Sequence, residues 1–173
     1  MASELARKLN LLMLSGNSYV SIQTGDEQRS AGIIQETRAL RNVALYDWSM
    51  TRGLRKIDSD GVPGLPVEKT LKAVQALAFI EQNTEPAIYV MRDFTPHGRD
   101  ALLVRMLRDL EPVLEQRGAT VIFLDTATLP DDVRRLTVQF DVGWPTTDEI
   151  EETVKQTFRR IRKKADATVL STV

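Results

Sequence analysis

The chain has 173 residues, of which 42% are hydrophobic and 27% charged, so it can bury one sizeable core and lacks the composition of a disordered protein. Its 23 basic and 24 acidic residues nearly cancel, which excludes an overall field that would draw it to nucleic acid or to an anionic membrane. It has no cysteine and one histidine, His97, which excludes disulfides, thiolate catalysis and a structural zinc site. Charged residues interrupt the first apolar stretch, as a signal peptide would not tolerate, so we expect a location in the cytoplasm or an equivalent compartment such as the plastid stroma.

Apolar periodicity and turn-forming residues predict helices and strands that alternate along the chain. The expected helices cover residues 3–14, about 26–40, 67–82, about 103–114 and about 147–164, with a short helical turn at 129–135. The expected strands cover residues 19–24, 43–48, 86–92, 120–124 and 136–140. Residues 51–66 contain three glycines and two prolines and are expected to form one long loop. Thr146 and Glu149 have the spacing of a capping box, which marks the start of the last helix.

Helices of crossover length between the strands predict an α/β fold, with a doubly wound, mainly parallel five-stranded sheet and helices on both faces. We expect a single domain over residues 1–173, with its core at about 18–141. The unbroken apolar run at 86–92 is expected to be a central strand, buried on both faces. In such sheets ligands bind beyond the carboxyl ends of the strands, so the residues that follow each strand form the candidate site.

The turn after the first strand lacks the phosphate-binding motif Gly-x-x-x-x-Gly-Lys-Ser/Thr. Thr24, Gly25, Asp26 and Glu27 occupy the degenerate positions, and none of the nine glycines is followed by lysine. Thr24 and Glu27 have the spacing of a capping box, so the helix is expected to satisfy its own N–H groups, and the two carboxylates would repel a phosphate. We therefore expect no catalytic residue and no bound cofactor in this chain.

The central strand ends in Asp93 and Phe94, which occupy the positions of a degenerate Walker B element. Asp93 is a candidate Mg²⁺ ligand, but an aspartate at this position more often caps the next turn. Phe94 stands where a glutamate would activate water, and an aromatic ring cannot take a proton. The sequence thus offers one metal candidate and no general base at this strand end.

A phosphoacceptor receiver domain would also place acids after the first strand, an aspartate after the third and a hydroxyl after the fourth, here the sensor-like Thr126. The lysine that such a domain needs after its fifth strand is absent, and the stretch 51–66 is too long. A free-standing receiver-like binding or signalling domain remains the alternative function, and a small-molecule enzyme the third.

Two pairs of residues, two arginines and two tryptophans, have side chains that are suited to interaction rather than catalysis. Arg134 and Arg135 follow the fourth strand, where an oligomeric ATPase could present arginine to a neighbouring subunit, although surface solvation is the simpler explanation. Trp48 and Trp144 are expected to be packing residues rather than stacking platforms, because only 6% of the chain is aromatic.

Several segments in order resemble the N-terminal domain of the AAA+ ATPases that are typified by a hypothetical chloroplast reading frame and also occur in cyanobacteria and other bacteria. The resemblance covers most of residues 8–155. The similar segments are Tyr19 to Thr24 with the acidic pair and Arg29, Trp48-Ser49-x-Thr51-x-Gly53-Leu54, Pro86-Ala87-Ile88 with Asp93-Phe94, Arg105-x-x-Arg108-Asp109-Leu110, and Leu129-Pro130 through Pro145-x-x-x-Glu149-Ile150.

In that family this region is a degenerate P-loop fold that precedes an AAA+ module with intact Walker motifs. The resemblance implies a non-catalytic pseudo-NTPase domain, a part or shortened relative of a larger ATPase, that serves assembly, regulation or client binding. It implies ATP and Mg²⁺ only for the attached module, and a homo-oligomeric ring by analogy. The stretch with Trp48 and Arg52 is expected to contact that module or a neighbouring subunit.

Overall fold

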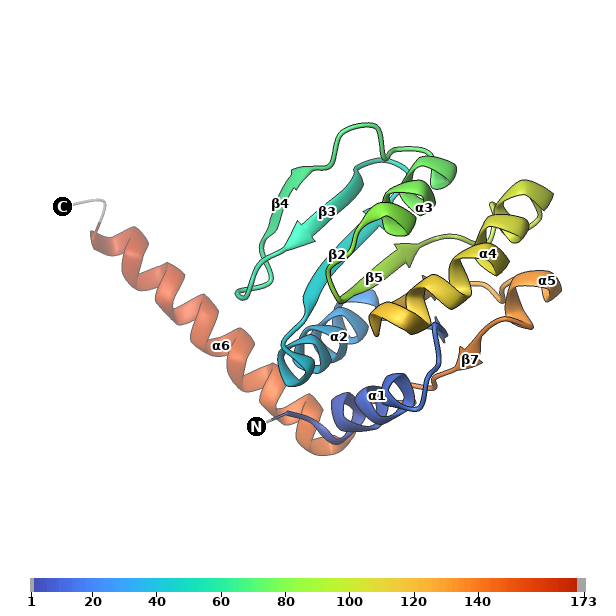
Figure 1. Ribbon diagram of the computed structural model, residues 1–173. Helices are drawn as coiled ribbons and strands as arrows, with labels where there is room; N and C mark the ends of the chain where they lie inside the picture. Colours follow the sequence, from blue (N-terminus) through green and yellow to red (C-terminus); the bar gives the residue numbers. More distant parts are fainter. Residues whose placement is uncertain (1, 171–173) are drawn as a thin grey trace. The chain divides into compact units, whose positions relative to one another are not determined.

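The computed structural model describes residues 2–170, which fall into two compact units, one that ends at Val142 and one that starts at Gly143 (Figure 1). The strands are β1 (Tyr19–Gln23), β2 (Ala44–Ser49), β3 (Gly53–Ile57), β4 (Pro63–Pro66), β5 (Ala87–Arg92), β6 (Thr120–Asp125) and β7 (Val138–Gln139). The helices are α1 (Glu4–Leu14), α2 (Glu27–Arg41), α3 (Ala73–Gln82), α4 (Ala101–Arg117), α5 (Asp131–Arg134) and α6 (Thr147–Leu170).

The first unit is an α/β fold around one seven-stranded sheet with the order β4-β3-β2-β5-β6-β1-β7. The strands β2, β5, β6, β1 and β7 run parallel, while β3 and β4 are antiparallel additions at one edge. The first strand thus lies between the fourth and fifth parallel strands, which is consistent with a P-loop-like fold. A receiver domain has the flavodoxin-like order 2-1-3-4-5, so the receiver-like architecture is wrong for this chain.

Side chains of the central strands alternate between two buried cores, one on each face of the sheet. Tyr89 and Phe123 belong to the core that α3 and α4 cover, whereas Val90 and Leu124 belong to the core that α1 and α2 cover. All residues of β5 up to Met91 are buried, which confirms the prediction of a central strand made from an unbroken apolar run. The sheet is therefore the middle of three layers.

The predicted sheet was too small, because residues 51–66 form the hairpin of β3 and β4 instead of a loop. Asp58 closes this hairpin, as its Oδ1 accepts from the N–H groups of Asp60 and Val62. The prolines Pro63 and Pro66 lie in an edge strand, the one place in a sheet where a missing N–H is tolerated. The glycine and proline content of residues 51–66 therefore led to a wrong prediction of a loop.

Two further element boundaries differ from the prediction. α3 begins at Ala73 rather than at residue 67, and Leu71, which lies before it, is 56% exposed. The fifth parallel strand is reduced to Val138–Gln139, both of them exposed. The position of β7 explains why this strand is short. It lies at the edge of the sheet, where it pairs with β1, and edge strands are often very short.

The second unit contains α6, which is longer than the predicted helix over about 147–164. Its start is as predicted, because Glu149 N–H donates to Thr146 Oγ1 at 3.3 Å and Thr146 N–H donates to Glu149 Oε2 at 2.7 Å. Within residues 2–170, none of the helices combines the length and apolar character that a membrane span requires.

The turn into β3 depends on Gly53, which has a φ of +68° and lies against the buried Thr70. A Cβ at this position would lie 3.0 Å from Thr70 Oγ1, the atom that accepts from Leu54 N–H. We expect Gly53→Ala to lower the free energy of unfolding by about 2 kcal/mol, through backbone strain plus this contact. Urea unfolding should show the loss, whereas Gly118→Ala, with a φ of +63° but open space around it, should lose only about 1 kcal/mol. Equal losses would mean that the contact with Thr70 costs nothing.

Candidate functional site

The turn between β1 and α2 is closed by its own side chains. Asp26 is the N-cap of α2, and its Oδ1 accepts from Arg29 N–H at 2.9 Å, while Thr24 Oγ1 accepts from Asp26 N–H at 2.9 Å. The predicted capping box of Thr24 and Glu27 is wrong, because Glu27 instead accepts from Arg92 Nη1 at 2.6 Å. A carboxylate nevertheless occupies the helix terminus, as expected, and Gly25 beside it is exposed.

At the end of β5, the predicted residue Asp93 lies at the surface and the predicted residue Phe94 lies in the core. Asp93 is exposed in the left-handed region with a φ of +51°, and Phe94 is fully buried, with its ring 4.9 Å from that of Phe123. In the part of the chain that the structure describes, no three acidic or histidine side chains are grouped as a metal site. Asp93 thus has no set of companion ligands there.

The carboxylate that holds the turn after β5 is Asp125, at the end of β6, a residue that was not predicted as part of a site. Its Oδ2 accepts from Phe94 N–H at 2.9 Å and from Thr95 N–H at 3.2 Å, and the residue is only 6% exposed. Burial raises the pKa of Asp125 above its ordinary value, against the opposing effect of the two amide donors. Its neighbour Thr126, the sensor-like residue, is exposed, and its carbonyl accepts from Gln23 Nε2 at 3.4 Å.

The candidate interaction residues lie in different surroundings. Trp48 is fully buried, so it is a packing residue, and its Nε1 donates to Thr70 O at 2.7 Å. Arg134 is exposed and paired with Asp131 at 2.7 Å, and Arg135 is exposed at the end of α5. Trp144 was predicted to pack and is instead 93% exposed, between Gly143 and Pro145. Of the proposed contact stretch, Arg52 is exposed and Trp48 is not.

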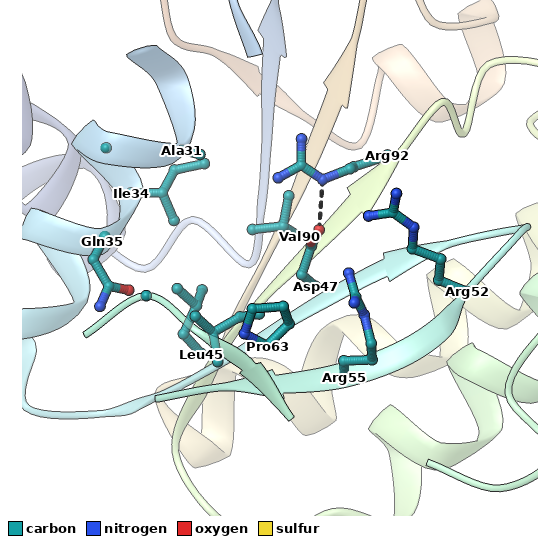
Figure 2. A pocket seen from close by; sticks show the side chains of 13 residues that line it. Ala31, Ile34, Gln35, Leu45, Asp47, Arg52, Arg55, Pro63, Val90 and Arg92 are labelled. Atoms are coloured by element: carbon teal, nitrogen blue, oxygen red, sulfur yellow. Dashed lines mark hydrogen bonds and ion pairs between the residues drawn. The ribbon is translucent and has the colours of Figure 1, made fainter. Parts of the chain in front are cut away.

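A cavity of about 420 Å³ lies on the α2 face of the sheet, between α2 and the β3–β4 hairpin. Figure 2 shows the guanidinium ends of Arg52, Arg55 and Arg92 turned toward one end of it, around Asp47. Apolar side chains form the rest of the lining together with small residues and Gln35: Ala31, Gly32, Ile34, Leu45, Ile57, Gly61, Pro63 and Val90. The cavity therefore has one charged end and one apolar end.

Arg92 is held by two carboxylates from two other elements. Its Nε donates to Asp47 Oδ1 at 2.7 Å and its Nη1 to Glu27 Oε2 at 2.6 Å. Burial alone would lower the pKa of Arg92, but Asp47 and Glu27 together raise it above its ordinary value. The pairing links β5, β2 and the start of α2, so this cation is fixed in place.

Three residues of this cavity were not predicted as site residues from the sequence: Asp47, Arg92 and Arg55. One signal was present: Asp47 and Arg92 each place a charge near the end of an otherwise apolar strand. Two opposite charges in two strands become informative once those strands are known to be neighbours, and β2 pairs with β5. Strand order is the information that sequence periodicity does not supply.

Fold and site together define a P-loop-like α/β domain whose first turn is closed by carboxylates. Residues 5–142 match the family described as SpoVK-like AAA ATPase, N-terminal domain, and the chain belongs to that family. This confirms the resemblance to the N-terminal domain of AAA+ ATPases. An uncharacterized AAA domain-containing protein of Trieres chinensis, ycf46, is 22% identical over 147 residues, which are 84% of this chain and 29% of that protein. The chain thus spans less than a third of this relative.

Proposed function

We propose that this chain is a non-hydrolysing N-terminal domain that serves the assembly or regulation of an AAA ATPase module, with capture of a client protein as a further role. The observation that carries the proposal is the turn between β1 and α2, where Asp26 caps the helix and Glu27 binds Arg92. Membership in an N-terminal domain family of AAA ATPases supports the association with such a module.

The residues at this turn do not fit a triphosphate. A phosphate at a helix N-terminus needs free backbone N–H groups and a nearby lysine. Here the N–H of Arg29 is already bonded to the Asp26 carboxylate, and the carboxylate of the neighbouring Glu27 is already bonded to Arg92. A phosphate would have to displace the Asp26 carboxylate from the helix terminus and compete with Glu27 for Arg92, so it would meet a carboxylate at both steps.

The end of β5 also lacks the chemistry of hydrolysis. Phe94 holds the position of a water-activating carboxylate and is buried against Phe123. The buried carboxylate nearby, Asp125, already accepts two backbone N–H groups at the turn after β5. Its role in this proposal is to shape that turn, while ATP and Mg²⁺ belong to the attached module.

Calorimetric titration of the chain with Mg-ATP tests the non-hydrolysing part of the proposal. We expect no saturable binding at micromolar nucleotide and no phosphate release, because the helix terminus is self-capped. Saturable micromolar binding accompanied by turnover would contradict the proposal.

The regulatory part is tested on the SpoVK-like AAA module that accompanies the domain. Its ATPase rate and its mass in solution should change when the chain is supplied, although the chain has no turnover of its own. A matched chain that carries Trp48→Ala, in which the core is disrupted, should lose the effect. If rate and mass are the same with and without the native chain, assembly and regulation are excluded as its role.

A further inference from the structure

The cavity between α2 and the β3–β4 hairpin shares Arg92 with the turn on which the proposed function rests, but its other lining residues have no part in that function. We propose that it binds a small organic anion, a molecule with a carboxylate or phosphate group on an apolar body, and that Arg52 and Arg55 hold the charged group. This inference does not depend on the regulatory role. It rests on three observations: two arginines that make no ion pair within residues 2–170, an apolar floor opposite them, and a suitable size.

The first observation is that Arg55 Nε has no acceptor within residues 2–170. In the antiparallel pair of β2 and β3, Arg55 lies directly opposite Asp47, yet the Asp47 carboxylate bonds to Arg92 instead. Arg55 Nε is shielded from solvent and has no hydrogen-bond partner. A buried guanidinium N–H without an acceptor is unfavourable, so a ligand that supplied one would remove this cost.

Arg52 provides a second available cation at the same end of the cavity. It lies in the turn between β2 and β3, and within residues 2–170 its side chain makes no ion pair. Arg92 adds a third positive charge but is already held by Asp47 and Glu27. The lining thus contains three arginines against one aspartate, and guanidinium groups match the planar geometry of carboxylates and phosphates.

The second observation is the apolar floor that faces the opposite end. Leu45, Ile57 and Val90 project from three adjacent strands, and Ile34 comes from α2. These four side chains are at most 9% exposed, and the apolar surface that they form favours a hydrocarbon or ring. A free inorganic anion would leave this surface unused.

The third observation is the size and setting of the cavity. Its volume of about 420 Å³ falls within the range of roughly 300–1,000 Å³ that is typical of small-molecule sites. The β3–β4 turn, which contributes Gly61 to the lining, also carries Asp58 and Asp60, so an extended polyanion such as nucleic acid would meet negative charge at that turn. A small ligand with one anionic group fits these surroundings.

Calorimetry in a phosphate-free buffer tests the inference with four probes: phenyl phosphate, benzoate, inorganic phosphate and benzyl alcohol. Phenyl phosphate and benzoate combine an anionic group with a ring, and comparing them distinguishes phosphate from carboxylate. Inorganic phosphate has the anionic group without the ring, and benzyl alcohol has the ring without the anionic group. We expect saturable binding of phenyl phosphate or benzoate with a dissociation constant on the order of 1 mM or lower, and weaker binding of the other two probes.

Three variants assign that binding to the cavity. Arg55→Met and Arg52→Met should each weaken it by roughly 10-fold, since each removes a charged hydrogen-bond donor. Arg135→Met, which removes an exposed arginine at the end of α5, should leave it unchanged. Binding that survives in both cavity variants, or an absence of saturable binding for all four probes, would overturn the inference.

The melting temperature of the free protein separates a ligand-binding arginine from a structural one. Arg55→Met removes an unpartnered donor and one of three like charges, so it should leave the melting temperature unchanged or raise it. A lower melting temperature with binding retained would show a structural arginine and overturn the inference. Mg-ATP bound at the turn of Thr24 to Asp26 would instead contradict the proposed function, without altering the outcome for the cavity variants.

Discussion

Trp48→Ala should lower the free energy of unfolding by about 3–5 kcal/mol, the largest effect that we expect from a single substitution in this chain. Trp48 is fully buried on the α3 face of the sheet, and its ring meets that of His97 at 5.7 Å. Its removal would leave a cavity and would also deprive the Thr70 carbonyl of its donor. Urea unfolding followed by far-ultraviolet circular dichroism measures the change.

Trp144→Ala is the matched control, because the second tryptophan is 93% exposed. Its effect on stability should stay within about 0.5 kcal/mol, as for most surface substitutions. A loss below about 1 kcal/mol for Trp48→Ala would contradict the packing described here. The pair also shows why Trp48→Ala cannot locate a contact surface, since a loss of assembly would follow from the damaged core alone.

Asp125→Ala should cost about 2–4 kcal/mol, because it leaves the N–H groups of Phe94 and Thr95 without their acceptor. Asp125→Asn keeps an oxygen at the same place and removes the buried charge, so it should stay within about 1 kcal/mol of the native chain at neutral pH. Comparison of the two variants by urea unfolding separates the loss of an acceptor from the loss of a charge. Equal destabilisation by both would mean that the turn requires the charge itself.

The pH dependence of stability tests the raised pKa of Asp125. Because burial raises this pKa, the native state holds the proton more tightly than the unfolded chain, so the contribution of Asp125 to stability is greatest at low pH. That contribution should fall as the pH rises from about 4, the ordinary pKa of an aspartate, through the raised native value. Relative to the native chain, Asp125→Asn should therefore gain stability across this interval. A difference that does not change with pH would exclude a raised pKa.

Most of the sheet could be predicted from the sequence, because strands buried on both faces have continuous apolar runs. β5 and β6 were found in this way, and their residues contribute to both cores. The hairpin of β3 and β4 was not predicted, because Gly61, Pro63 and Pro66 are typical of loops. Prolines such as these are compatible with a strand when the strand lies at the edge of a sheet. Edge position is a property of the assembled sheet and cannot be read from residues 51–66 alone.

The candidate sites also contain features that the local sequence predicts and features that it does not. The absence of a lysine from the turn after β1 is a local fact, and it could be read directly. The roles of Asp125 and Arg92 depend on neighbours that are distant in the chain, since Asp125 bonds to residues 31 and 30 positions away and Arg92 to Asp47, 45 positions away. Such contacts follow from strand order, which local patterns leave open.

Both edges of the sheet are poorly suited to pairing with a further β-strand. At one margin Pro63 and Pro66 withhold two of the four N–H groups of β4, and at the other β7 is only two residues long. A second copy of the chain therefore finds no continuous ladder on which to add its own strand. At high protein concentration the domain should therefore resist cross-β polymerisation.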